Sequence, residues 1–289
     1  MFLLRASTWI LLMLDVRGSG LTAEQAFSAI YKRDRWGGGS NQTAGGGSGG
    51  GSSEAGAIGA SRIIFHLAMK YALSGIVDAP CGAMAWQESL VNQLQHAIPG
   101  FRYLGLDVVQ SVVERNRARF VSWPNVTFVE ADLTRPESVQ VKQGANGLLF
   151  SRDSMMHNTL EGCWQMLDTF TRSPVKYVLL GSYGADKPGR RNGAVQIGRW
   201  FSIQLDKPPF GMQYIEKIPE ANIVGENKYM FLYDRKALRK ELIHRGHIKL
   251  EPWPRRPGNP TWQQPDSKPA NQANHQTGNA TRQSGNPAA

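Results

Sequence analysis

The sequence predicts an α/β fold: a doubly wound, mostly parallel sheet flanked by helices. From residue 54 onward, short apolar runs alternate with amphipathic helical stretches, as expected when parallel strands are linked by helices. Several of the apolar runs end in an acidic residue or a glycine turn, which is typical of strands that stop at one edge of a sheet. The length of 289 residues is sufficient for a domain with a substantial core.

The elements follow one another at regular intervals. A capping-box pattern at Thr22 and Gln25 predicts a first helix that stops at Trp36 and the glycines after it. Apolar residues at helical spacing then predict helices over 57–73, 86–94, 112–120 and 156–170. Strands are expected between them, over 75–79, 102–106, 126–129, 147–150 and 175–181.

Composition divides the chain into unlike parts. Residues 21–53 join the first helix to a Gly/Ser-rich stretch, in which nine of the residues over 37–53 are glycine. That stretch is either a flexible linker or a lid whose bare backbone orders over a ligand. The α/β domain spans 54–250, and residues 251–289, rich in Pro, Asn and Gln, have the composition of a disordered tail.

The first twenty residues form a separate segment. Arg5 precedes an apolar run over 6–14 and then small residues, an order that resembles a targeting segment. A segment that packs on the domain is the alternative, so the localisation is cytoplasmic, or organellar or secretory if residues 1–20 act as a signal. No apolar run approaches the roughly 20 residues that span a bilayer, and no membrane span is expected.

The charge and the cysteine content restrict the kinds of partner and metal site that are expected. The formal net charge is +10, but the basic residues are scattered apart from short clusters at 190–191 and 235–245. A scattered excess is typical of a solvated surface, so nucleic acid is not the expected partner. The two cysteines, Cys81 and Cys163, exclude a disulfide-rich scaffold and a Cys-only zinc site, and no metal is expected.

Acidic side chains end the first strands of the predicted sheet. Asp78, Asp107 and Asp132 lie at or just after the first three strands, and Ser151 and Asp153 follow the fourth. Ligands of open α/β sheets bind outside the carboxyl ends of the strands, so these residues form the candidate site. The alternative for each Asp is a structural role in a turn or at a helix N-terminus.

The first turn and the second acid predict a nucleoside-type ligand. Gly82 allows the backbone to come close to a ligand, and the helix after it offers unpaired N–H groups. Asp107 can accept hydrogen bonds from two ribose hydroxyls. The dinucleotide fingerprint G-x-G-x-x-G is absent, because Pro80 and Met84 stand in the turn, and this argues against NAD or FAD.

These residues resemble the class I S-adenosylmethionine-dependent methyltransferases. The run 78–82, Asp-Ala-Pro-Cys-Gly, is similar to their first motif, usually D-x-G-x-G. The resemblance is closest to a branch that reads roughly D-x-P-C-G-D-x-x-W, with R-D-x-x-x-H after the fourth strand; here those patterns are residues 78–86 and 152–157. It covers about residues 29–245, including aromatic residues before the Gly/Ser stretch and a final aromatic strand over 229–233.

The resemblance implies a doubly wound, mostly parallel seven-stranded sheet flanked by helices. It also implies S-adenosyl-L-methionine as the cofactor and in-line transfer of its methyl group to an acceptor. The implied cofactor-binding residues come from the turn, the strand ends and the stretch before the first strand: Asp78, Pro80, Cys81, Gly82, Asp107, Asp132, Ser151 and Trp36. The Gly/Ser stretch becomes a candidate lid over the cofactor, anchored by Tyr31 and Trp36.

Asp153 and His157 are the candidates for a catalytic general base. If a helix begins near Asp153, residues four apart share one face and both side chains flank the acceptor. In the alternative interpretation, Asp153 caps that helix and His157 is a packed or surface imidazole.

The sequence leaves the methyl acceptor open, as a small molecule or a protein, and gives no oligomeric state. The signature [DNS]-P-P-[YF], which marks methylation of bases and glutamine, is missing after the fourth strand. Ala83 replaces an acid of the branch, and Met84 stands where a second glycine is usual. These two departures motivate the alternative of a catalytically inactive cofactor-binding module or an RNA- or protein-interaction module.

Overall fold

The structure is a computed structural model that describes residues 21–38, 46–139, 146–184, 191–193, 195–221 and 227–250. All of them belong to one compact unit. The candidate targeting segment over 1–20, the predicted tail over 251–289 and part of the Gly/Ser stretch lie outside the described residues.

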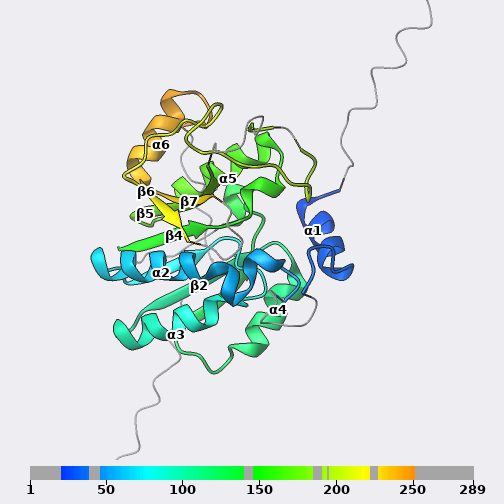
Figure 1. Cartoon of the computed structure of the whole chain (residues 1–289), viewed down its shortest axis with the longest axis vertical. Coiled ribbons are helices and arrows are strands. Elements are labelled where there is room, and N and C mark those ends of the chain that lie inside the picture. The colour runs from blue at the N-terminus through cyan, green and yellow to red at the C-terminus, as the bar shows by residue number, and fades with distance from the viewer. Residues whose placement is uncertain are drawn as a thin grey trace, which may run out of the picture. The chain divides into compact units, whose positions relative to one another are not determined.

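A seven-stranded sheet forms the centre of the described residues (Figure 1). Its strands are β1 (Gly75–Asp78), β2 (Arg102–Asp107), β3 (Val126–Glu130), β4 (Gly147–Ser151), β5 (Tyr177–Tyr183), β6 (Glu216–Glu220) and β7 (Lys228–Asp234). The helices are α1 (Ala23–Lys32), α2 (Glu54–Lys70), α3 (Gln87–Ala97), α4 (Gln110–Arg119), α5 (Leu160–Arg172) and α6 (Arg235–His244), with short 3-10 turns η2 (Gly50–Ser52), η3 (Pro136–Ser138) and η4 (Met155–His157).

The strand order is β3-β2-β1-β4-β5-β7-β6. Strands β1 to β5 pair in parallel, whereas β7 is antiparallel to both of its neighbours. The order reverses between β1 and β4, where Asp78 is in register with Phe150. The predicted fold class is confirmed, and the reversal marks the edge at which such sheets bind ligands.

Burial explains why the central strands read as continuous apolar runs. Every residue of β4 is buried, and β5 is buried except at Gly181. Strands covered by helices on both faces cannot alternate apolar and polar residues, because neither face meets water. Helix α2 packs against α3, and α5 packs against α6, in two separate groups beside the sheet (Figure 1).

Side-chain caps set the starts of the first two helices. The capping box predicted for α1 is present, with hydrogen bonds in both directions between Thr22 and Gln25. Helix α2 begins after Ser53, whose hydroxyl accepts a 3.0 Å hydrogen bond from the N–H of Gly56. Both caps satisfy backbone donors that have no partner inside the helix.

The helix predicted over 156–170 begins later than expected. Thr159 caps α5, since its hydroxyl accepts from the N–H of Gly162 at 2.9 Å. Residues 155–157 form the separate turn η4, and Asp153 has a left-handed φ of 52°. The prediction that Asp153 and His157 share a helix face is therefore wrong, and Asp153 is not the cap of α5 either.

Candidate active site

A pocket opens at the carboxyl edge of the sheet, beside the point where the strand order reverses. The space between its lining residues, together with the open solvent at its mouth, is about 850 Å³. Seven of the eight predicted cofactor residues and both candidate bases line it: Trp36, Asp78, Pro80, Cys81, Gly82, Asp107, Asp132, Asp153 and His157.

Ser151 is the predicted site residue that does not line this pocket. It ends β4 buried, and its hydroxyl bonds to that of Ser154 at 2.7 Å. It borders a small neighbouring hollow instead, which shares Asp153 and Ser154 with the main pocket. The roles of all ten predicted residues remain predictions, but nine of them are now placed around one space.

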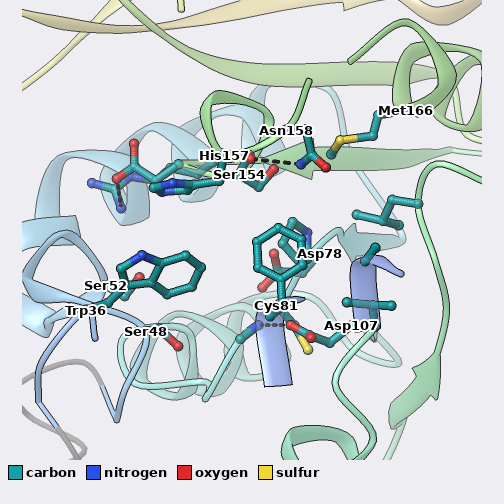
Figure 2. A pocket seen from close by; sticks show the side chains of 18 of the residues that line it. Trp36, Ser48, Ser52, Asp78, Cys81, Asp107, Ser154, His157, Asn158 and Met166 are labelled. Carbon is teal, nitrogen blue, oxygen red and sulfur yellow. Dashed lines mark hydrogen bonds and ion pairs between the residues drawn. The ribbon is translucent and has the colours of Figure 1, made fainter. Parts of the chain in front are cut away.

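The turn after β1 and the acid at the end of β2 are joined directly (Figure 2). The N–H of Gly82 donates to Oδ2 of Asp107 at 3.0 Å, and the N–H of Val109 donates to Oδ1 at 2.9 Å. Burial raises the pKa of Asp107 to about 6, although these backbone N–H groups act in the opposite direction. The N–H of Val108 also bonds to this carboxylate, so three backbone donors orient Asp107, which lines the pocket.

The next backbone donor of the turn is also occupied. The N–H of Ala83 donates to the hydroxyl of Ser48 at 3.1 Å, and this hydroxyl bonds to that of Tyr31 at 2.7 Å. Gly82 has a φ of 54°, and a Cβ there would lie 2.8 Å from Oγ of Ser48. Glycine is therefore required at 82, both for its positive φ and for the close approach of Ser48. Because the N–H groups of Gly82 and Ala83 are already bonded, the turn does not present a row of free N–H groups of the kind that holds phosphate.

Asp78 is buried beneath the pocket floor. Its Oδ2 accepts from the hydroxyl of Tyr103 at 2.7 Å and from Nε2 of Gln87 at 2.8 Å. Burial raises the pKa of Asp78 to about 8, against the influence of these two donors. The Oε1 atom of Gln87 is buried and has no hydrogen-bond partner, although Gln87 lines the pocket.

Asp132 borders the pocket after β3. Its Oδ1 accepts from the N–H of Thr134 at 2.9 Å and from the Thr134 hydroxyl at 2.6 Å, which fixes the carboxylate at the head of a turn. Val108 and Leu133 add apolar surface to the lining of the pocket.

A buried cluster of four charges lies at the β4 side. Arg152 bonds to Oε1 of Glu220 through Nε at 2.9 Å and Nη2 at 2.6 Å, and to Asp153 at 3.1 Å. The amine of Lys228 lies 3.1 Å from Oδ2 of Asp153. Burial alone would raise the pKa of Asp153, but Arg152 and Lys228 outweigh it and hold the pKa below its usual value.

His157 faces Trp36 across the mouth of the pocket (Figure 2), with ring centroids 4.8 Å apart. Nδ1 of His157 lies 2.9 Å from the carbonyl oxygen of Arg199. A carbonyl oxygen only accepts, so Nδ1 carries the hydrogen and Nε2 keeps a free lone pair in the neutral ring. Burial lowers the pKa of His157, which favours this neutral form.

Sequence reasoning missed three contributors to the site. In the sequence, Arg152 stands out only as the first residue of the R-D-x-x-x-H pattern, and its partner Glu220 lies 68 residues away in the chain. Gln87 directly follows the Trp of the first motif, and nothing in its local pattern indicates contact with Asp78. Ser48 is one of several serines in the Gly/Ser stretch, and only the fold distinguishes it.

No group of three or more His, Cys, Asp or Glu side chains is arranged to hold a metal ion within the described ranges. No helix in the same part of the chain is long and apolar enough to cross a membrane.

Comparison with family models and with curated proteins finds no match. Among solved structures, the chain is similar to a SAM-dependent methyltransferase from Anabaena variabilis (14% identity, TM-score 0.49, 75% of this chain and 97% of that one). It is also similar to magnesium protoporphyrin IX methyltransferase from Synechocystis with bound SAM (14%, 0.46, 74% and 97%). A third similar structure is human N-acetylserotonin methyltransferase in complex with SAM, at 16% identity and a TM-score of 0.47; the match covers 74% of this chain and 60% of that one. Likeness at this level concerns the fold and assigns neither a ligand nor a reaction.

Proposed function

We propose that this protein is an S-adenosylmethionine-dependent methyltransferase. The observation that carries the proposal is the hydrogen bond from Gly82 to Asp107, which sets a carboxylate of the pocket lining beside the close-approach turn that follows β1 at the strand-order reversal. A vicinal diol such as that of ribose matches two carboxylate oxygens. The pocket carboxylates Asp107 and Asp132 disfavour a pyrophosphate, since like charges repel.

The pocket also fits the remaining parts of this cofactor. Val108 and Leu133 would sandwich the adenine ring, with Asp132 near its amino group. The unpartnered Oε1 of Gln87 and the carboxyl group of Asp78 would accept hydrogen bonds from the cofactor's ammonium group. An orphaned buried acceptor of this kind is expected where a ligand supplies the missing donor.

The bound cofactor would supply an activated methyl group on its sulfonium. The protein then has to hold an acceptor in line, exclude water and, where the acceptor loses a proton, receive that proton. Trp36, from the segment after α1, would cover the pocket mouth, because its ring contacts that of His157 at a tilt of 37° and lines the pocket. The acceptor is not specified by these features, and it remains a small molecule or a protein.

We assign the general base to His157 rather than Asp153. Nε2 of His157 is the basic atom, because Nδ1 is bonded to the Arg199 carbonyl and the ring is neutral. Asp153 is paired with two cations that lower its pKa, so it is a weak proton acceptor. Its role in this proposal is to anchor the wall beside the acceptor.

Neither departure in the first motif favours the inactive-module alternative. Ala83 and Met84 are almost completely buried and do not line the pocket, so a different side chain at either position would face the core. The sulfur of Met84 lies against the hydroxyl oxygen of Tyr103, whose single hydrogen is donated to Asp78. Loss of the usual acid and glycine therefore leaves the pocket wall intact.

A thermal-shift panel tests the proposal. Wild-type protein is melted with S-adenosylhomocysteine, S-adenosylmethionine, NAD⁺ and adenosine, each at equal concentration. A ligand at 100 times its dissociation constant adds about 2.7 kcal/mol to the free energy of unfolding, so a bound ligand raises Tm by several degrees. We expect the first two to stabilise most. Stabilisation by NAD⁺ alone would overturn the proposal.

A further inference from the structure

Arg152 makes two contacts that its ion pairs do not require. Nη1 donates to the carbonyl oxygen of Gly51 at 2.8 Å, and Nη2 donates to that of Gly56 at 3.1 Å. Gly51 lies in η2, within the Gly/Ser stretch, and Gly56 lies in the first turn of α2. One buried guanidinium thus bonds to β6, through Glu220, and to two segments about a hundred residues earlier.

The backbone of the Gly/Ser stretch lies directly on the charge cluster. A Cβ at Gly51 would lie 3.0 Å from Oδ2 of Asp153, which is tighter than ordinary van der Waals contact. A Cβ at the neighbouring Gly50 would meet nothing within 4 Å. Close approach at 51 is therefore a local requirement of this contact and not a general property of the glycine run.

The same stretch forms part of the pocket wall. Ser48 and Ser52 both line the pocket (Figure 2); Ser48 precedes η2, and Ser52 is its last residue. Ser48 bonds to the turn after β1 through the N–H of Ala83, at the opposite end of residues 46–53 from Arg152. The backbone N–H groups of Ser52 and Ser53 donate to Gly49 and Gly50, so this segment has ordered hydrogen bonds.

We infer that Arg152 is a positioning residue that holds residues 46–53 against the pocket and so sets the wall made by Ser48 and Ser52. The planar guanidinium is needed because three acceptors lie around it in different directions, at Glu220, Gly51 and Gly56. Only the ligand-affinity part of this inference rests on the proposed function. The placement of the segment can be measured without any ligand.

Arg152→Lys is the first test. Lysine keeps the positive charge between Asp153 and Glu220 but cannot reach all three acceptors at once. We expect hydrogen exchange of the Ser52 and Ser53 amides to accelerate by about tenfold or more, while exchange in β4 and β5 is unchanged. Arg172→Lys is the control, since Arg172 pairs with Asp168 in α5. Unchanged exchange of residues 46–53 in Arg152→Lys would overturn the inference.

Gly51→Ala and Gly50→Ala form a matched pair that leaves Arg152 intact. The two variants add the same methyl group to adjacent residues, but only the one at 51 meets the Asp153 carboxylate. Gly51→Ala is expected to accelerate exchange as Arg152→Lys does, and Gly50→Ala is expected to leave it near the wild-type rate. Equal acceleration in both would show that the contact with the cluster does not hold the segment.

Affinity for S-adenosylhomocysteine gives the second readout. Arg152→Lys and Gly51→Ala are expected to weaken binding by about tenfold, or about 1.4 kcal/mol, with a smaller change in kcat and the same acid limb of the pH–rate profile. Faster exchange with unchanged affinity would refute a role in the pocket wall. If wild-type protein binds no S-adenosylhomocysteine, the proposed function fails, and the exchange experiment still decides whether Arg152 holds the segment.

Discussion

The N–H of Gly82 donates a 3.0 Å hydrogen bond to Oδ2 of Asp107, joining the turn after β1 to the end of β2. The bond crosses 25 residues of sequence and aligns a close-approach backbone with a carboxylate that is 4% exposed. It also removes a backbone donor that a phosphate would need. This one contact therefore favours a nucleoside diol over a pyrophosphate as the ligand.

Substitutions of Asp107 are expected to separate binding from stability. Asp107→Asn keeps one oxygen for a backbone donor and should weaken S-adenosylhomocysteine binding by at least about tenfold. Asp107→Ala leaves the N–H groups of Gly82 and Val109 without their acceptor, so it should also lower the free energy of unfolding by about 1–3 kcal/mol. Calorimetry measures the first effect, and urea unfolding measures the second. Full affinity in Asp107→Asn would contradict the assignment.

Asp78 should make the protein less stable as the pH rises. Burial raises the pKa of Asp78 in the folded protein to about 8, so the folded state binds a proton that the unfolded chain has released. The stability from this group is present below the unfolded pKa of about 3.9 and is lost as the pH rises to about 8.

Asp78→Asn provides the comparison for that pH dependence. Its amide can still accept from Tyr103, but it does not titrate. The Tm of this variant minus the Tm of the wild type should increase from about pH 4 to about pH 8, the interval between the unfolded and the folded pKa of Asp78. A difference that stays constant over this range would mean that Asp78 is not protonated in the folded state.

The pH–rate profile should show an acid limb caused by His157. Protonation blocks Nε2, so kcat/KM should fall as the pH drops through the pKa of His157, which burial holds below its usual 6.5. Provided that the acceptor loses a proton, His157→Asn should lower kcat by about 10²- to 10⁴-fold, the usual contribution of a general base. His244→Asn, at an exposed position at the end of α6, is the control. An acid limb that persists in His157→Asn would assign the base elsewhere.

Trp36 should contribute to ligand binding through its ring. It contacts the rings of His157, Phe27 and Tyr31 at centroid distances of 4.8, 5.9 and 6.0 Å. Trp36→Ala removes these contacts and opens the pocket mouth, whereas Trp36→Phe keeps an aromatic wall. Affinity for S-adenosylhomocysteine is expected to fall by about tenfold in the first and to change much less in the second. Equal affinities in the two variants would mean that Trp36 does not cover the ligand.

The central strands and their terminal acids were predictable because each is a local pattern. A buried parallel strand reads as a short apolar run, and the residue that follows it marks the binding edge. Strand β6 was not predicted from the sequence, because it is a largely polar edge strand that contains Pro219. Proline is tolerated at an edge, where a missing N–H breaks no ladder.

The start of α5 and the charge cluster depend on information that the local sequence does not carry. Met155 and Met156 continue the apolar spacing of α5, but the cap at Thr159 places them in a separate turn. The contact between Arg152 and Gly51 spans 101 residues, so only the folded sheet brings them together. The ion pairs of Asp153 with Arg152 and Lys228, which leave His157 as the proposed base, likewise form only in the folded chain.

Isothermal titration calorimetry of wild-type protein with S-adenosylhomocysteine, repeated on Asp107→Asn, tests the proposed function most directly. We predict one site per chain with a dissociation constant in the micromolar range or below, about −8 kcal/mol, and a loss of at least about tenfold in the variant. Absence of binding by the folded wild-type protein would contradict the assignment of the pocket to this cofactor.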